Sequence, residues 1–565
     1  MHIHIVPNRS SAPAVLLRQS YREGGKVKKR TLANLSSLPM AQVEAIRAVL
    51  RGDTLVPLAA SFQIIGSLGH GHVQAVRAAM KQLGFAALIG AAPSRERDLV
   101  TAMVAARILA PDTKLATTRW WKTSSLAEEF GVADADEDDL YRAMDWLLAG
   151  QDRIEKKLAS RHLKEGGLVL YDLSSSWFEG KTCPLARRGY SRDGRKGTLQ
   201  VNYGLLTDRR GCPVAVSVHE GNTADASTLM PEIERVRTKF GIEKLVIVGD
   251  RGMVSQKAIC EIRTRDGIDW ISALKTTSMR ALVDEGQLQL DLFDERNLFE
   301  LAHPDYPGER LVACRNPQLA KLRAHKREEL LEATEASLAK IQARVGAGRL
   351  KGADKIGLAT GKILNQYKVA KHFDLSIGET AFSFARNAGR IASEAALDGI
   401  YVIRTSLAAE RMDPAECVRS YKSLTQVERA FRTMKTVDLK IRPIHHRLEN
   451  RVRAHIFLCM LAYYVEWHMR EAWRELMFAD EDQDAKAMRD PVAPAKRSAA
   501  AKQKALTRQR DDGTPVHSFR TLLAELSTIV KNTCQAPGST ATFTIVTTPN
   551  ALQNRAQKLI DTISM

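Results

Sequence analysis

The sequence lacks the features that mark membrane, secreted and small metal-binding proteins. It has no run of about 18 apolar residues and no signal-peptide pattern at its start, MHIHIVPNRSS, so we expect a cytoplasmic protein without a membrane partner. Its seven cysteines form no CxxC pair and no ligand-like spacing with the 14 histidines. This spacing argues against a disulfide framework and against structural zinc.

Acidic residues are also in short supply relative to basic ones. The chain has 84 Lys and Arg against 65 Asp and Glu, which gives a net charge of +19 and a pI near 9.6. A basic excess of this size suits a polyanionic partner, because each neutralised phosphate releases counterions. Charge alone does not separate a nuclease from a ribosomal or chromatin protein, but it makes nucleic acid the first partner to test.

At 565 residues the chain is too long for one core and should hold three or four domains. The start predicts a β-hairpin around Gly24-Gly25, and apolar periodicity then predicts a helical region suited to DNA binding. A strand-rich region follows in two parts, separated by an insertion, and the chain ends in a basic linker and a small region. The expected boundaries are 1–38, 39–163, 164–275, 276–396, 397–475, 476–515 and 516–565, in that order.

The strand-rich region has an order that brings two aspartates together. LVLYDLSSSWF is an apolar strand interrupted by Asp172; a hairpin, a helix and the short strand KLVIVGD follow, ending at Asp250. A helix and the strand DWISALK come next. A single Asp at a strand end is usually a turn or helix cap. Two on neighbouring strands favour a shared site, because desolvated carboxylates are costly unless paired or bound to a cation.

The segment 413–435, DPAECVRSYKSLTQVERAFRTMK, spaces Tyr421, Glu428 and Lys435 seven residues apart. On a helix this spacing drifts by only about 20°, so the three side chains share one face, with Arg432 beside them. Thr425-x-x-Glu428 also fits a capping box, in which the Glu only closes a helix start. Asp172, Asp250 and Glu428 together favour a metal site, and two cations about 4 Å apart can drive an in-line displacement at a phosphodiester.

With these motifs, the sequence resembles the DDE transposases of bacterial insertion sequences, in the group marked by a Tyr-Arg-Glu-Lys signature. The features that carry the resemblance are the strand order, the insertion, the late Glu and Tyr-x2-Leu-x3-Glu-x6-Lys. It covers about residues 166–470. The resemblance implies an α/β fold with a ribonuclease H-like mixed sheet flanked by helices, interrupted by the insertion and preceded by a mainly helical DNA-binding region.

The resemblance also assigns roles. Asp172 at the end of the first strand, Asp250 at the end of the fourth and Glu428 would be the catalytic metal ligands, holding two Mg²⁺ or Mn²⁺ ions. Tyr421 and Lys435 would contact phosphates at the transposon end. Position 424 is Leu where the signature has Arg, so Lys422, Arg429 or Arg432 would have to supply that charge. The partners implied are the terminal inverted repeats, target DNA and a second copy of the chain, as a homodimer in the synaptic complex. When bound to DNA, the protein would be associated with the nucleoid.

Further along, Arg442 and Arg447 lie near the pair His445-His446 and, with Arg432, are further candidates for DNA contacts. Few acids stand at ligand spacing to these histidines, so phosphate contacts or core hydrogen bonds are favoured over metal binding. Two other functions stay open beside the transposase: a catalytically silent DNA-binding regulator derived from one, and a metal-dependent nuclease that does not transpose. The presence of all three acids argues against the regulator.

Overall fold

The computed structural model describes residues 1–8, 12–53, 62–288, 293–295, 297–483, 490–493, 496–536 and 539–564. The chain forms two compact units. The first contains residues 1–68 and 530–548, and the second contains residues 69–529 and 549–565. Among the described residues, no helix is both long and apolar enough to cross a membrane.

The first unit is built from antiparallel strands. The expected hairpin around Gly24-Gly25 is present, and a preceding strand extends it to the order β1-β2-β3. A second sheet has the order β17-β16-β4, so the end of the chain pairs with an early strand. The elements are β1 (His2–Val6), β2 (Ala14–Glu23), β3 (Lys26–Asn34), α1 (Met40–Arg51), β4 (Gln63–Gly69), β16 (Val530–Gln535) and β17 (Thr542–Val546).

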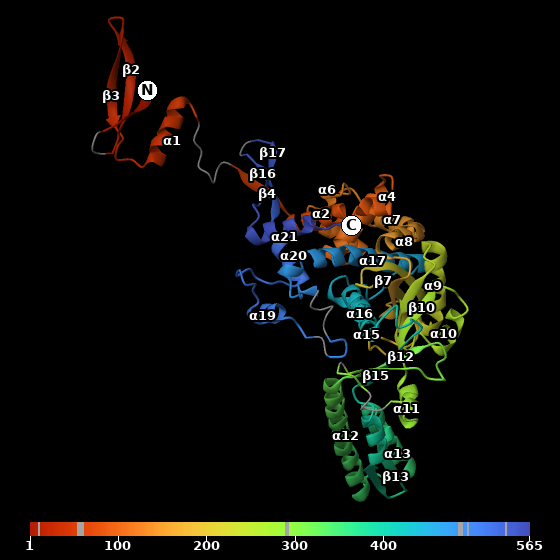
Figure 1. The fold of residues 1–565 in the computed structure, drawn as a ribbon. Coiled ribbons are helices and arrows are strands. Elements are labelled where there is room, and N and C mark those ends of the chain that lie inside the picture. The colour runs from red at the N-terminus through yellow and green to blue at the C-terminus, as the bar shows by residue number, and fades with distance from the viewer. Residues whose placement is uncertain are drawn as a thin grey trace. The chain divides into compact units, whose positions relative to one another are not determined.

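The second unit is organised around a nine-stranded mixed sheet with the order β11-β12-β15-β10-β9-β5-β7-β6, in which β8 also pairs with β7 (Figure 1). Strands β10, β9 and β5 are parallel, and the other pairings are antiparallel. The strands are β5 (Gly167–Trp177), β6 (Arg187–Arg188), β7 (Leu199–Asp208), β8 (Pro213–Glu220), β9 (Leu245–Val248), β10 (Ile268–Ala273), β11 (Leu298–Leu301), β12 (Arg310–Arg315) and β15 (Ile400–Thr405).

Helices surround this sheet. In the expected helical region, α4 packs on both α7 and α17, so that region shares the core of the second unit, while α1 belongs to the first. The helices are α2 (Gly71–Gln82), α3 (Phe85–Ile89), α4 (Arg95–Leu109), α5 (Lys114–Trp120), α6 (Leu126–Glu129), α7 (Glu137–Ala149), α8 (Gln151–His162), α9 (Asp225–Phe240), α10 (Gln256–Ile262) and α11 (Thr276–Asp284).

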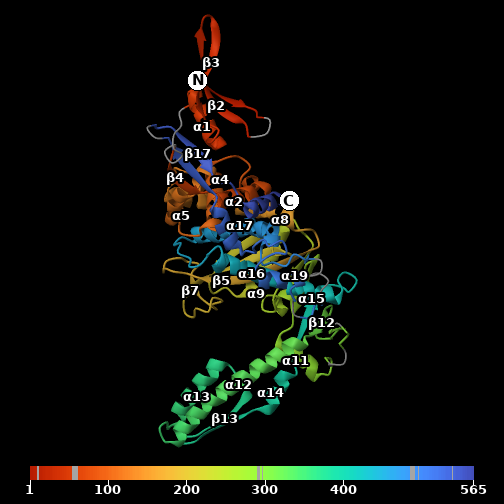
Figure 2. The same ribbon diagram turned by 90° about the vertical axis from the view of Figure 1, so that its left-hand side faces the viewer.

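The expected insertion at 276–396 is not wholly separate from the sheet. Strands β11 and β12 lie within it, yet β12 pairs with β15 along six residues of the main sheet. One apolar cluster joins α11 and β12 to β15. A second cluster lies wholly within the insertion, where α12, α13 and the β13–β14 hairpin lie side by side (Figure 2). These elements are α12 (Pro317–Gly346), α13 (Ala353–Tyr367), β13 (Phe373–Ile377), β14 (Phe382–Arg386) and α14 (Ala388–Ala395).

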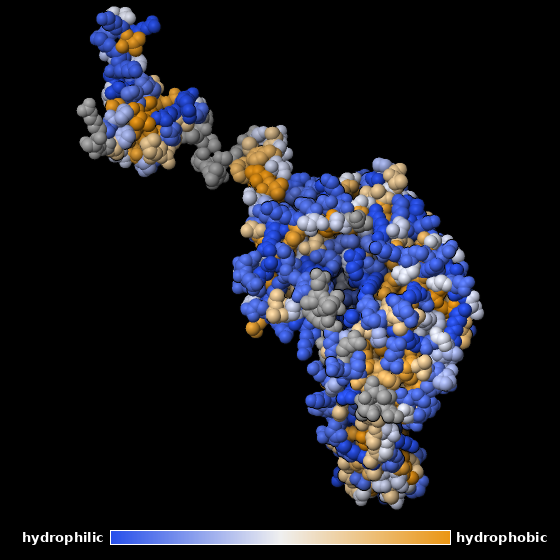
Figure 3. Space-filling model, in the orientation of Figure 1, coloured by the Kyte–Doolittle hydropathy of each residue, from blue (hydrophilic) through white to orange (hydrophobic). Residues whose placement is uncertain are grey.

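The late helices complete the second unit. The 24-residue α17 is buried along most of its length, and α16 packs on β5. The expected linker at 476–515 contains a helix, α19, whose Lys504 is buried and donates to the Glu475 carbonyl; residues 484–489 and 494–495 of this stretch lie outside the described residues. The helices are α15 (Pro414–Lys422), α16 (Leu424–Arg432), α17 (Glu449–Ala472), α19 (Ala499–Thr507), α20 (Phe519–Ser527) and α21 (Ala551–Asp561). Figure 3 shows a mostly hydrophilic face with scattered hydrophobic patches.

Candidate active site

The sheet register brings the two predicted aspartates to one place. Strands β5 and β9 are parallel neighbours, and their last paired residues are Leu170 and Val248. Asp172 and Asp250 each follow two residues later, so they leave the paired region at the same level of the sheet. Adjacent parallel strands present such residues at a common edge, as the strand order predicts.

Asp172 does not end its strand, contrary to the expectation from the sequence. β5 continues to Trp177, because its other edge pairs with β7 over nine residues, and Asp172 stands opposite Leu205 within that ladder. The strand therefore ends for one neighbour and continues for the other. Asp172, the polar interruption in LVLYDLSSSWF, therefore lies just beyond the point where the pairing of β5 with β9 stops, and β5 itself continues past it.

Glu428 reaches the same region from α16. On this helix Val427, Ala430 and Phe431 are buried, and the Phe431 ring lies 5.7 Å from that of Tyr203 on β7. These apolar side chains pack α16 onto the sheet. The alternative capping box does not form: the hydroxyl of Thr425 donates to the Lys422 carbonyl, and the helix start has no side-chain cap.

The segment 413–435 is not one continuous helix. α15 ends at Lys422, α16 begins at Leu424, and residues Thr433–Val437 form a short π-helix. The seven-residue spacing therefore crosses two breaks. Asp413 caps α15 by accepting a hydrogen bond from the Glu416 amide at 2.9 Å.

All three acids line one cavity of about 380 Å³. Most of the residues around it are charged or hydroxylic, and Leu173 and Phe431 are the apolar ones. Four basic side chains face the carboxylates across this space. The lining residues are Asp172, Leu173, Ser174, Arg192, Asp193, Asp225, Asp250, Glu428, Phe431, Arg432, Lys435, Thr436 and Arg442.

The carboxylate of Asp172 is electrostatically unfavourable in this setting. Burial raises its pKa to about 7, and the negative charges of Asp250 and Glu428 add to that rise. One backbone donor opposes it, the Leu173 amide, which lies 2.8 Å from Oδ1. Asp250 is better compensated, because its Oδ1 accepts from the amides of Gly252 and Met253 at 3.0 and 2.7 Å.

A buried carboxylate organises the cationic side of the cavity. The side chain of Asp193 is 2% exposed, and its Oδ1 accepts from Lys435 Nζ at 3.1 Å and pairs with Arg442. Its other oxygen accepts from the Trp177 amide at 3.1 Å. Burial lowers the pKa of Lys435, and Asp193 opposes that shift. Lys435 is therefore fixed in the wall by an internal anion.

Some of the other predicted DNA contacts lie at the cavity and others do not. Arg432 lines the cavity and Arg447 does not. Tyr421 lies close enough to feel the three acids: its pKa rises to about 12, first through burial and then through Asp250. Leu424 packs against the hydrophobic core.

Of the three side chains that might replace the signature arginine, only Arg432 lines the cavity. Lys422 donates to the Val492 carbonyl and lies over the Tyr401 ring, and Arg429 is exposed outside the cavity. Arg432 is thus the best placed of the three to supply the charge of the missing signature arginine.

Sequence reasoning missed Arg192, Asp193 and Asp225. The first two belong to the loop between β6 and β7, where the Arg192 amide donates to Ser175 on β5 at 3.2 Å; Arg192 also pairs with Asp225 at the start of α9. The local sequence SRDG has the composition of an ordinary turn. The available signal was only its position between two strands of the main sheet.

A family model described as the transposase DDE domain matches residues 176–465, slightly more than half of the chain. This range includes Asp250 and Glu428 and begins just after Asp172. A second model, the IS1634 family transposase N-terminal domain, matches residues 3–55.

The search of curated proteins found no match. Among solved structures, the chain is similar to the cryo-EM structure of the piggyBac transposase synaptic complex with hairpin DNA. The identity is 7% and the TM-score 0.33, over 80% of this chain and 77% of that one. On the family matches, the chain belongs to the DDE transposases of insertion sequences, enzymes that act on DNA.

Proposed function

We propose that Asp172, Asp250 and Glu428 are the catalytic residues and metal ligands of this transposase. The observation that carries the proposal is their meeting in one cavity from β5, the end of β9 and α16. Carboxylate oxygens are the ligands that Mg²⁺ and Mn²⁺ prefer. The raised pKa of Asp172 supports the fit, because a bound cation would relieve the burial and repulsion that cause it.

Two ions, each Mg²⁺ or Mn²⁺, suit this site better than one. Among the described residues, groups of three ligand atoms within 4.8 Å of one another occur elsewhere, and these three acids do not form such a group. Acids that are further apart than one ion's shell can share two ions about 4 Å apart. When bound, the pair would supply activation of the attacking oxygen and stabilisation of the leaving oxygen at phosphorus.

The basic wall would hold the DNA backbone against the acids. Lys435, Arg442, Arg432 and Arg192 all line the cavity, which supports binding of an anionic phosphodiester there. Asp193 would act as a positioning residue, since it fixes the first two of these cations before DNA arrives. Tyr421 would contribute a phenol near the cleaved end, and its raised pKa keeps it a hydrogen-bond donor.

The wider assignment rests on family membership and on the sheet. We infer a ribonuclease H-like sheet, binding of the element's terminal inverted repeats, a homodimer in the synaptic complex, and strand transfer after cleavage. The parallel order β10-β9-β5 flanked by antiparallel strands supports the first point. The second family match extends the transposase assignment to residues 3–55, and a DNA-binding role for the helical region 39–163 stays a prediction.

The experiment uses the full chain and DNA carrying one end of its element. With Mg²⁺, Asp172→Ala, Asp250→Ala and Glu428→Ala should each abolish cleavage, while binding in EDTA persists. Arg447→Ala, outside the cavity, should retain cleavage. Full cleavage by any of the three alanine variants would overturn the assignment of that residue.

A strand-transfer reaction with pre-cleaved ends then separates the remaining possibilities. Joining of the 3′ end to target DNA supports the transposase reaction. Cleavage without joining would indicate the non-transposing nuclease, and binding without either reaction would indicate the silent regulator.

A further inference from the structure

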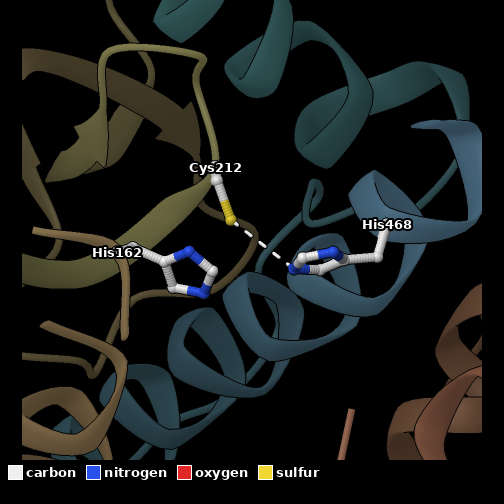
Figure 4. A group of neighbouring side chains, drawn as sticks. All are labelled: His162, Cys212 and His468. Atoms are coloured by element: carbon white, nitrogen blue, oxygen red, sulfur yellow. Dashed lines mark hydrogen bonds between the residues drawn. The ribbon is translucent and has the colours of Figure 1, made fainter. Parts of the chain in front are cut away.

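A second cluster of reactive side chains lies apart from the catalytic cavity. His162 is the last residue of α8, Cys212 immediately precedes β8, and His468 lies near the end of α17. One ligand atom from each lies within 4.8 Å of the others, and Figure 4 shows the three side chains converging. Their distance along the chain explains why cysteine and histidine spacing gave no sign of them.

We propose that His162, Cys212 and His468 bind one Zn²⁺ ion. A thiolate and two imidazoles are a donor set that zinc prefers. Bond lengths of about 2.3 Å to sulfur and 2.0–2.1 Å to nitrogen place S and N about 3.6 Å apart in a tetrahedral site. Cys212 Sγ and His468 Nε2 are 3.8 Å apart, so binding needs only a small adjustment of the side chains.

The protonation changes are simple. Burial lowers the pKa of His162, and it lowers the pKa of His468 to about 3, so both rings are neutral and carry a free lone pair near pH 7. Cys212 is a thiol, whose pKa burial raises. Binding therefore forms a Zn–S bond as the thiol proton leaves to solvent, and no oxidation is involved.

Two neighbours act as the outer support that metal-binding residues usually have. His162 Nε2 lies 3.1 Å from the Tyr464 hydroxyl, which leaves Nδ1 as the nitrogen for the ion. The Cys212 amide donates to Asp208 Oδ1 at 2.9 Å, and this bond fixes the backbone of the β7–β8 turn. Both contacts orient ligands without occupying the space between them.

The cluster also has an entry path. His162 and His468 line a cavity of about 500 Å³, together with Arg161, Arg210 and Glu471. None of the residues around this cavity lines the catalytic one. A water molecule from the cavity can complete four-coordination. Arg161 and Arg210 oppose a cation, although Arg210 favours the Cys212 thiolate, so the expected site is moderate in affinity.

Zinc at this position would join three elements around the sheet. α8, the β7–β8 hairpin and α17 each provide one ligand, and β7 is the antiparallel partner of β5, which carries Asp172. The ion would therefore cross-link these three elements at one edge of the sheet. This site does not depend on the assignment of the catalytic acids.

The experiment measures zinc in the full-length protein with the catalytic acids disabled. Asp172→Asn with Glu428→Gln provides this background, so that zinc in the catalytic cavity is not counted. After gel filtration in metal-free buffer, we expect one zinc per chain by mass spectrometry. Cys212→Ser and His468→Ala should lose it, and Tyr464→Phe should weaken zinc affinity about tenfold in a chelator competition.

Cys459→Ser is the matched control. Cys459 lies on α17 and is buried, as Cys212 is, and its Sγ lies 4.0 Å from one histidine nitrogen, His455 Nε2. It should retain zinc. Cobalt substitution gives a second readout: a sulfur-to-cobalt charge-transfer band that Cys212→Ser abolishes and Cys459→Ser keeps. A background protein without zinc after exposure to it, or a folded Cys212→Ser protein with undiminished zinc, would overturn the proposal.

Discussion

Replacing Asp172 by Asn should stabilise the metal-free protein at pH 8 even though it removes a catalytic ligand. Burial and the neighbouring acids raise the pKa of Asp172 from the usual 3.8 to about 7. The folded state thus holds the Asp172 proton more tightly than the unfolded state does. Its stabilising effect is complete below about pH 4 and is lost as the pH rises through 7.

The magnitude follows from the difference between those two pKa values. At about 1.4 kcal/mol for each pKa unit, the ionised carboxylate costs the metal-free fold about 4 kcal/mol at pH 8. Asn keeps the shape of the side chain and cannot ionise. We therefore expect Asp172→Asn to raise the free energy of unfolding by about 2–4 kcal/mol at pH 8, and by less at pH 5.

The assay is thermal unfolding of both proteins in EDTA between pH 5 and 8. The melting temperature of Asp172→Asn should exceed that of the unsubstituted protein by a growing margin as the pH rises, and added Mg²⁺ should stabilise only the unsubstituted protein. Asp250→Asn is the comparison: its carboxylate accepts two backbone amides, so its loss should give no such gain. A margin for Asp172→Asn that is absent or independent of pH would refute the reasoning.

Further predictions concern the cationic wall and the metal. Asp193→Asn should lower the free energy of unfolding by about 3–5 kcal/mol in urea denaturation, because Lys435 and a neighbouring arginine lose a buried partner; an unchanged midpoint would contradict this. Arg432→Ala should weaken end-DNA binding and reduce the salt slope by about one, whereas Arg429→Ala, outside the cavity, should leave it unchanged. Lys435→Ala should likewise lower that slope, and an equal slope would exclude a phosphate contact. The half-saturating Mn²⁺ concentration should fall by up to about tenfold per pH unit below pH 7, as Asp172 loses its proton, and then level off; a flat profile would argue against Asp172 as a ligand.

Much of the sheet could be predicted from the sequence, because most of its strands have a clear local pattern of apolar residues and turns. β9 is a short apolar run, and the β7–β8 hairpin has a clear turn at Asp208–Gly211. β12 could not be assigned in the same way. It lies between an acidic stretch and a long basic helix, and only its pairing with β15, about 90 residues later, makes it part of the main sheet.

The residues of the candidate site likewise fall into those that a local pattern predicts and those that only the fold brings together. Acids that follow apolar strands are visible in sequence, because a carboxylate beside a buried strand is unusual. Asp193 is not visible in this way, since its role comes from two cations that follow it by more than 240 residues. The same holds for the cluster at Cys212 and His468, which are 256 residues apart. Local patterns identify strands and caps, and they miss charge pairs made by the fold.

The segment 413–435 brings Glu428 and Lys435 to one cavity, but not through the single helix that the spacing predicted. A single helix would place Tyr421, Glu428 and Lys435 on one face, but the chain breaks after Lys422 and widens into a π-turn at Thr433–Val437. π-Turns inside helices often occur at functional sites, because the extra residue redirects the side chains that follow. Here the π-turn contains Lys435, which is buried against Asp193, while Glu428 stays exposed toward the cavity. Glu428 and Lys435 are thus held by different local structures, the first by α16 and the second by the π-turn. A substitution that alters the π-turn should therefore weaken DNA binding more than metal binding.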